Sequence, residues 1–224
     1  MISPELINKF NAGARLARAG DPEGAIRVFE EILGPARTRD PGQPQIATGD
    51  FIGQTIMRKA WCFMDLGRYQ EARQEFDAPI MQACLGQFDL GILYEYFFSH
   101  GNVLGELGEI EQMDDRFARA MGIAADEGDA NKVQQCWVNL MNYAVRHEAW
   151  EYLERESRTC IKFSENSGLE SLGLAAGLRR ARALARLGSR DKAIAQLERV
   201  EQAAAKAQLK EALEAATRLR AELA

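Results

Sequence analysis

The amino-acid sequence predicts an all-α protein built from repeated antiparallel helical hairpins. Its 224 residues include only six prolines and are rich in Ala, Leu, Glu and Arg, a composition that favours helices. Runs of β-branched residues with period-two alternation, which would indicate strands, are missing from the sequence. Glycine turns recur at nearly constant spacing between helical patterns. These three observations predict a helical repeat array with essentially no sheet.

The clearest hairpin lies between Trp61 and Phe76. Gly67 supplies the left-handed backbone conformation that ends a helix without steric cost. Ala72 and Phe76, four residues apart, place a small and a large apolar side chain on the inner face of the next helix. This stretch therefore predicts the end of one helix, a tight turn, and a second helix folded back on the first.

The predicted turns recur at a regular interval along the chain. Turns at positions 20, 67, 108, about 148 and 188 are separated by 47, 41, 40 and 40 residues. A second series of glycines, at 86, 128 and 168, has intervals of 42 and 40 residues. The long first interval coincides with a Pro/Gly-rich stretch from Gly34 to Pro44, which predicts an exposed loop. Two interleaved series with one period predict five hairpins.

Local signals set the ends of several helices. Ser3 and Pro4 predict the N-cap and first position of the opening helix. Pro79 lies inside the second helix of the second hairpin, where it predicts a break near Asp77 because proline removes a backbone hydrogen bond. We expect Gly86 to end that helix.

The third and fourth hairpins depart from the pattern of the others. Met113 and Leu153 stand where the other units have alanine, and Glu148 stands where a turn glycine is expected. We therefore expect these two units to pack more loosely or at a different angle. In the last helix an apolar stripe predicts a cap over the open end of the stack; it consists of Leu209, Ala212, Leu213, Ala216, Leu219 and Leu223.

The predicted organisation is one domain over residues 1–224. Its repeats are expected at about 4–39, 48–86, 89–128, 129–168 and 169–207, with the capping helix at 208–224.

Residues around the turns resemble the tetratricopeptide repeat (TPR) superfamily. The best match is Leu66-Gly67-Arg68-Tyr69-Gln70-Glu71-Ala72 with Phe76; Gly13, Leu16, Gly20-Asp21, Ala25 and Phe29 match in the first unit, and Leu187-Gly188 with Ala193 in the fifth. The period near 40 residues is longer than the usual unit of about 34 and is similar to that of kinesin light chains and of bacterial regulator sensor arrays. The resemblance implies a right-handed superhelical array, a TPR-like α-solenoid, that serves as a scaffold for binding.

Charge is distributed unevenly along the chain. Residues 168–224 hold 11 Lys/Arg and 7 Asp/Glu, a net charge of +4, while residues 1–167 hold 17 and 26, a net charge of −9. Such asymmetry favours association with oppositely charged partners or other copies. The four cysteines form no Cys-x-x-Cys pair and are expected to be reduced and buried. No signal peptide and no membrane span are evident, which predicts a cytoplasmic protein with no membrane partner.

No motif indicates catalysis. The two histidines lie in different repeats without further ligands at metal-binding spacing, and no phosphate-binding loop is present. We predict no enzymatic activity, no catalytic or metal-binding residues and no cofactor. A basic stretch interleaved with aromatic residues is also missing, so the sequence does not favour a nucleic-acid partner.

A polar stripe on the first helix of each hairpin is the candidate binding surface. Positions nine, six and two residues before each turn share one helical face. In the TPR superfamily this helix lines the concave groove that holds peptides or partner helices. The candidates are Asn139, Asn142, Arg146, Arg179, Arg182 and Arg186 in the last two units, with Arg58, Trp61 and Asn102 from earlier ones. Asn amides pair with peptide backbone, and guanidinium groups bind carboxylates bidentately.

The sequence thus predicts an interaction module that binds a protein or peptide segment, acidic or carboxylate-bearing, in its concave groove. Four alternatives stay open for the stripe: a solvated face, asparagines bonded to a neighbouring repeat, Arg182 and Arg186 paired with acidic residues of the third repeat in another molecule, and a tryptophan that only packs. A self-assembling scaffold, and hence a homo-oligomer, is the second functional hypothesis. A ligand-sensing regulatory domain of a bacterial signalling or transcription system is the third.

Overall fold

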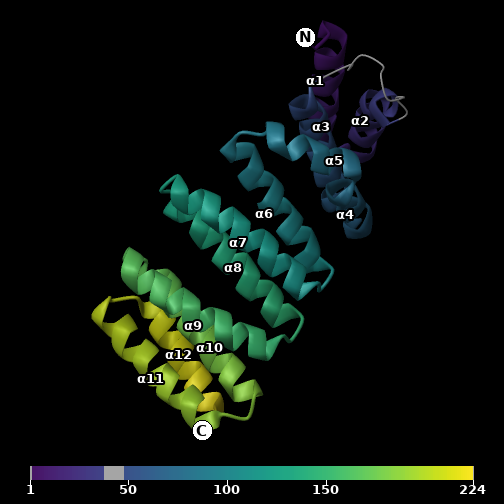
Figure 1. Ribbon diagram of the computed structural model, residues 1–224. Helices are drawn as coiled ribbons and strands as arrows, with labels where there is room; N and C mark the ends of the chain where they lie inside the picture. The colour runs from purple at the N-terminus through teal and green to yellow at the C-terminus, as the bar shows by residue number, and fades with distance from the viewer. Residues whose placement is uncertain (1, 38–47, 224) are drawn as a thin grey trace. The chain divides into compact units, whose positions relative to one another are not determined.

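Twelve α-helices and one 3₁₀ turn make up the regular structure of residues 2–37 and 48–223, the part described by the computed structural model (Figure 1). No strand occurs in these two ranges. The helices are α1 (Pro4–Arg18), α2 (Pro22–Arg37), α3 (Gly49–Asp65), α4 (Tyr69–Asp77), α5 (Pro79–Cys84), α6 (Leu90–Glu106), α7 (Ile110–Asp126), α8 (Ala130–Arg146), α9 (Trp150–Ser167), α10 (Glu170–Arg186), α11 (Arg190–Lys206) and α12 (Lys210–Leu223). The predicted all-α array of helical hairpins is confirmed.

The turns close in the same way in every hairpin. Gly20, Gly67, Gly108 and Gly188 have φ of 82°, 69°, 77° and 74°, and Glu148 adopts the same left-handed region at 53°. The residue after each turn donates its N–H to the carbonyl five positions earlier, as from Arg68 to Phe63 at 2.8 Å. This Schellman arrangement pairs carbonyls that the end of a helix would otherwise leave without a donor.

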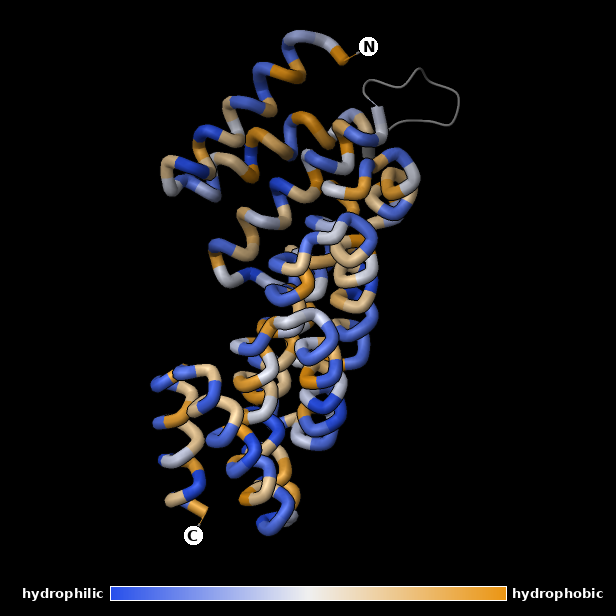
Figure 2. Tube along the Cα trace, turned by 90° about the vertical axis from the view of Figure 1, so that its left-hand side faces the viewer, coloured by the Kyte–Doolittle hydropathy of each residue, from blue (hydrophilic) through white to orange (hydrophobic). Residues whose placement is uncertain are grey.

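The chain divides into two compact units, residues 1–123 and residues 124–224. In the first unit, α3 packs against α2, α4 and α5, and α4 packs against α6. In the second, α10 packs against α9 and α11, and α12 packs against α11 and α10. Apolar and polar segments alternate along each helix, as expected for helices that bury one side (Figure 2). The single-domain assignment and the handedness of the array stay predictions.

A small residue on the first helix faces a large one on the second. A Cβ added to Gly13 would lie 2.7 Å from the ring of Phe29, and one added to Gly101 would lie 3.1 Å from the ring of Phe117. These glycines therefore allow the paired helices to approach closely.

In the fourth hairpin the large side chain is on the first helix and the small one is on the second. Met141 occupies the position of Gly13 and Gly101, seven residues before the turn, and Ser157 occupies that of the phenylalanines. Both side chains are fully buried, and the Ser157 hydroxyl lies 3.7 Å from the Met141 sulfur. Met113 and Leu153, the larger residues at alanine positions, are also fully buried. The large sulfur-containing side chain thus fills the space that an aromatic ring fills elsewhere.

Most predicted helix ends agree with the structure. The Ser3 side chain accepts from the N–H of Leu6 at 3.3 Å, and Pro4 begins α1. The break near Asp77 is confirmed: α4 ends there and α5 begins at Pro79. Helix α5 ends at Cys84, and a 3₁₀ turn, Leu85–Gln87, follows it.

One predicted boundary is wrong. The loop expected from Gly34 onward begins later, because α2 continues to Arg37 with Pro35 inside its last turn. Proline removes the bond to the carbonyl four residues earlier and crowds that carbonyl. Here the carbonyl belongs to the exposed Glu31, so water can satisfy it. The remainder of the expected loop, residues 38–44, lies outside the described residues.

The capping helix packs as predicted. Ala216 of α12 is fully buried in a cluster with Leu174, Ala181 and Leu197, and partly buried residues of the stripe surround it: Ala212, Leu213, Leu219 and Leu223. Leu209 precedes the helix and is 37% exposed. The four cysteines, Cys62, Cys84, Cys136 and Cys160, are buried and form no disulfide with one another, as predicted.

Candidate functional site

The stripe residues of the first unit are engaged in packing. The indole nitrogen of Trp61 in α3 donates to the hydroxyl of Ser99 in α6 at 2.8 Å. The guanidinium carbon of Arg58 lies 4.8 Å from the centre of the Trp61 ring. Trp61 is half-buried, and so is Asn102, one turn beyond Ser99. These contacts support the packing interpretation of Trp61.

In the second unit, α8 and α10 are joined by a polar contact between two stripe residues. Arg179 Nη2 donates to Asn142 Oδ1 at 2.7 Å, and Arg179 Nη1 donates to the carbonyl of Ala175 at 3.4 Å. Asn142 therefore bonds to the neighbouring repeat, as one of the alternatives held. The same bond fixes the direction of the Arg179 side chain, which is otherwise half-buried between the helices.

A hollow of about 300 Å³ opens beside this contact. Asn142, Arg179 and Arg182 supply its polar rim; the apolar lining consists of Val145, Ala175, Leu178, Ala215 and Leu219. Its three walls come from α8, α10 and α12. We call it the α8–α12 groove.

The groove carries excess positive charge. Burial and the neighbouring guanidinium of Arg182 both lower the pKa of Arg179, which means that the two cations repel each other in partly desolvated surroundings. Arg182 is exposed, and within residues 2–37 and 48–223 it makes no hydrogen bond or ion pair. A carboxylate placed between the two arginines would relieve this repulsion and accept charge-assisted hydrogen bonds from both.

The other three candidates of the second unit lie outside the groove lining. The guanidinium of Arg146 lies 5.3 Å from the centre of the Tyr143 ring, and that of Arg186 lies 5.5 Å from the centre of the Trp150 ring. Asn139 is half-buried one turn before Asn142. The structure thus brings together three of the six candidates in this unit.

The sequence-based prediction did not include the apolar residues of the groove. Ala175, Leu178 and Arg182 are separated by three and four residues, so they share one face of α10. A stripe drawn through position 178 instead of position 179 would have included all three. The contribution of Ala215 and Leu219 was harder to foresee, because the apolar stripe of α12 predicted only a cap.

Other site types are not assembled in the described part of the chain. No group of three or more His, Cys, Asp or Glu is placed there to hold a metal ion. Burial raises the pKa of Cys160 to about 12 and that of Cys62 to about 11, so both stay protonated thiols at neutral pH. No described helix combines the length and the apolar character that crossing a bilayer requires.

Comparison with known proteins identifies the fold. No family model matches the sequence, and no curated protein matches it. The structure is similar to that of RapI in its apo form, with a TM-score of 0.62, 14% identity, and coverage of 97% of this chain and 71% of that one. It is also similar to aspartyl phosphate phosphatase F from Bacillus subtilis, with a TM-score of 0.59, 13% identity, and coverage of 100% and 70%.

A third similar structure is a kinesin-light-chain-type protein of Podosopora anserina with nearly identical TPR-like repeats. Its TM-score is 0.58 at 18% identity, and the alignment covers 93% of this chain and 100% of that one. Sequence identities this low carry the arrangement of helices and nothing more specific. The chain therefore has the all-α, TPR-like helical-repeat fold.

Proposed function

We propose that this protein is a non-enzymatic interaction module, cytoplasmic in location, whose α8–α12 groove binds a carboxylate-bearing peptide segment. The observation that carries the proposal is the pair Arg179 and Arg182 beside an apolar lining. Arg179 is fixed by Asn142, and Arg182 lacks an acidic partner among the described side chains.

The groove suits a short segment with mixed character. The two guanidinium groups offer donors to a carboxylate, from an acidic side chain or from the end of a chain. Leu178 and Leu219 offer apolar surface to a neighbouring side chain of the ligand. A volume of about 300 Å³ is enough for one or two side chains rather than for a folded domain.

A selection experiment tests the proposal without a known partner. A random peptide library is displayed and selected on the full chain, and binding of the enriched peptides is measured by calorimetry. We expect the enriched peptides to share a carboxylate next to an apolar residue. Arg182→Glu should weaken them at least about tenfold, since it removes a charge-assisted hydrogen bond and adds a like charge.

Arg199→Glu in α11 is the matched control, because it makes the same charge reversal in the same unit outside the groove. Enriched peptides without carboxylates, or equal losses in the two variants, would rule the groove out as the binding site. The helical circular dichroism signal should be unchanged in both.

Self-assembly is the second candidate and rests on the charges of +4 for residues 168–224 and −9 for residues 1–167. Association driven by these charges should weaken as salt screens them. Sedimentation at low and high salt separates the two ideas: a monomer under both conditions argues against the scaffold, and a salt-sensitive oligomer supports it.

A further inference from the structure

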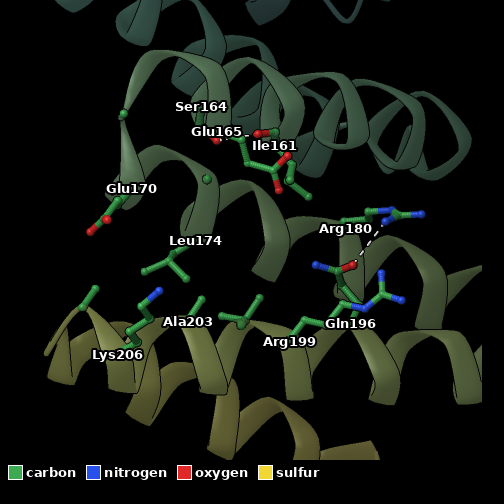
Figure 3. Close-up of a pocket in the computed structure, with 14 residues that line it drawn as sticks. Ile161, Ser164, Glu165, Glu170, Leu174, Arg180, Gln196, Arg199, Ala203 and Lys206 are labelled. Carbon is green, nitrogen blue, oxygen red and sulfur yellow. Dashed lines mark hydrogen bonds between the residues drawn. The ribbon is translucent and has the colours of Figure 1, made fainter.

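A second and larger cavity lies elsewhere in the same unit, between α9, α10 and α11 (Figure 3). Its volume is about 690 Å³, within the range of roughly 300–1,000 Å³ that small-molecule sites occupy. It shares no lining residue with the α8–α12 groove, because it faces the opposite side of α10. We call it the α9–α11 cleft.

The middle of the cleft is apolar. Leu174 of α10 forms its back and Ala203 of α11 its floor, with Ile161 of α9 above. Val200 of α11 also lines the cleft. Leu174 and Val200 are nearly buried by the protein itself, so they form a firm surface rather than a mobile one. A flat apolar body of modest size could cover this surface.

One end of the cleft is positively charged. Glu154 accepts from Arg180 Nε at 3.0 Å and from Arg158 Nη2 at 2.6 Å, so one carboxylate is shared by two guanidinium groups. Arg199 adds a third cation and makes no hydrogen bond or ion pair with any side chain that the structure describes. Figure 3 shows its guanidinium directed toward Gln196.

Gln196 is held in place at this end. Its Oε1 accepts from Arg180 Nη1 at 3.2 Å, and only 8% of the residue is exposed. The bond uses the oxygen of the amide, so the NH₂ group, which lies beside Gly177 of α10, remains available as a donor. Arg180, Gln196 and Arg199 thus lie together at this end of the cleft, and each carries donor groups.

The other end has no excess of positive charge. Lys206 and Glu170 lie there, and Figure 3 shows the Glu170 carboxylate directed away from the cleft. The Glu165 carboxylate extends from α9 beside Ile161, over the part between the two ends. An anionic group is therefore favoured only at the arginine end. The acidic residues nearby also make a doubly charged phosphate a poorer match than a single carboxylate.

We propose that the α9–α11 cleft binds a small monocarboxylate with an apolar body. The carboxylate is held by Arg199, Arg180 and Gln196, and the body lies over Leu174, Val200 and Ala203. This site is separate from the peptide groove. A ligand bound in it would contact α10 and α11 and would not contact α8.

Three probes with one shared body test the charge preference. The labelled full chain is titrated with 4-phenylbutyrate, 4-phenylbutan-1-ol and 4-phenylbutylamine, and binding is followed by amide chemical shifts in NMR spectra. We expect shifts in α9, α10 and α11, with the acid binding about tenfold more tightly than the alcohol and the amine weakest.

Substitutions locate the two parts of the ligand. Arg199→Glu should reduce the affinity for the acid at least about tenfold while leaving that for the alcohol within about twofold. Ala203→Phe, at an exposed position on the floor, should fill the cleft and abolish binding of both. Lys192→Glu is the control on the same helix, at an exposed position outside the cleft lining, and should change the affinity for the acid by less than about threefold.

The proposal is overturned if no shifts map to α9–α11 at millimolar probe, or if the amine binds as tightly as the acid. Equal losses in Arg199→Glu and Lys192→Glu would also contradict it, since they would indicate a general charge effect. Arg182→Glu should leave these titrations unchanged, so failure here and failure of the peptide groove are separate results.

Discussion

His100 lies in α6 with 1% of its surface exposed, stacked on Phe76 at 5.2 Å between ring centres. Arg116 Nε donates to its Nδ1 at 3.2 Å, so the neutral ring carries its proton on Nε2. Nε2 lies 3.4 Å from Asp77 Oδ1 without forming a hydrogen bond. Burial lowers the pKa of His100 to about 4; Asp77 opposes this shift, and Arg116 reinforces it. Two further groups contribute less to the pKa of His100: Arg73 lowers it, and Asp115 raises it.

This buried histidine predicts a loss of stability in acid. Between pH 6.5 and 4 the unfolded chain binds a proton at His100 that the folded chain excludes, so the free energy of unfolding falls as the pH falls through this window. The loss is expected to reach about 2–3 kcal/mol near pH 4. Above pH 6.5 both states are neutral at this position, and the contribution is constant.

Urea unfolding at several pH values measures the effect. His100→Asn keeps an acceptor for Arg116 and removes the titrating ring, so its stability should depend less on pH than that of the wild type between 6.5 and 4. If the free energy of unfolding depends on pH in the same way in both proteins, groups other than His100 cause the loss of stability in acid.

Met141 and Ser157 provide a second test at the level of single residues. The structure indicates that a large Met and a small Ser replace the small and aromatic pair of other hairpins, such as Ala60 and Phe76. Met141→Ala should leave a cavity and Ser157→Phe should overpack the site, each costing about 2 kcal/mol or more. The double variant recreates the Ala–Phe pair and should lose less than the sum, by at least about 1 kcal/mol. Strictly additive losses in a double-mutant cycle would contradict this pairing.

At the scale of the helices, the turn residues set where one helix ends and the next begins. Glu148 and Gln208 have φ of 53° and 59° at turns where the other hairpins carry glycine. A side chain in this region strains the backbone by roughly 1–2 kcal/mol relative to a helical conformation.

Glu148→Gly should therefore stabilise the protein by about 0.5–1 kcal/mol, after allowance for the flexibility of glycine in the unfolded chain. Gly67→Ala makes the reverse change and should destabilise it by about 1 kcal/mol. A Cβ at Gly67 meets no atom within 4 Å, so backbone strain is the only cost. Thermal unfolding measures both variants, and a destabilised Glu148→Gly would show that its side chain makes contacts worth more than the strain.

The helices were largely predictable because their signals are local. Gly67, Pro79 and the apolar stripe of α12 each act within one or two turns of backbone, and the structure agrees with all three. The end of α2 was not predictable in this way, since Gly34 and Pro35 disfavour helix but do not forbid it in a last turn. The burial of Lys59 was also not predictable from local signals, because its partner Glu75, 2.9 Å away, lies on another helix.

The candidate site was predictable only in part, for the same reason. The periodicity of α8 and α10 placed Asn142, Arg179 and Arg182 on one face, and they do line one groove. The third wall depends on how α12 packs against α10, which is a tertiary property that the pattern of a single helix does not contain. The α9–α11 cleft was missed for the same reason, since its polar residues come from three helices.

At the scale of the molecule, both proposed binding sites lie within residues 124–224. This unit contains the α8–α12 groove and the α9–α11 cleft on opposite faces of α10. The stripe residues of the first unit, by contrast, are largely engaged with one another, as with Trp61, Arg58 and Ser99. We therefore propose a ligand-binding role for the second unit and a structural role for the first.

The most direct measurement of the central claim is a double-mutant cycle across the groove. A selected peptide and its carboxamide analogue are each titrated by calorimetry into the wild type and into Arg182→Gln. If Arg182 binds the carboxylate, the two changes share one interaction, and the coupling free energy should be at least about 1 kcal/mol. A coupling free energy of zero, with the carboxamide peptide bound as tightly as the acid, would contradict the carboxylate-binding groove.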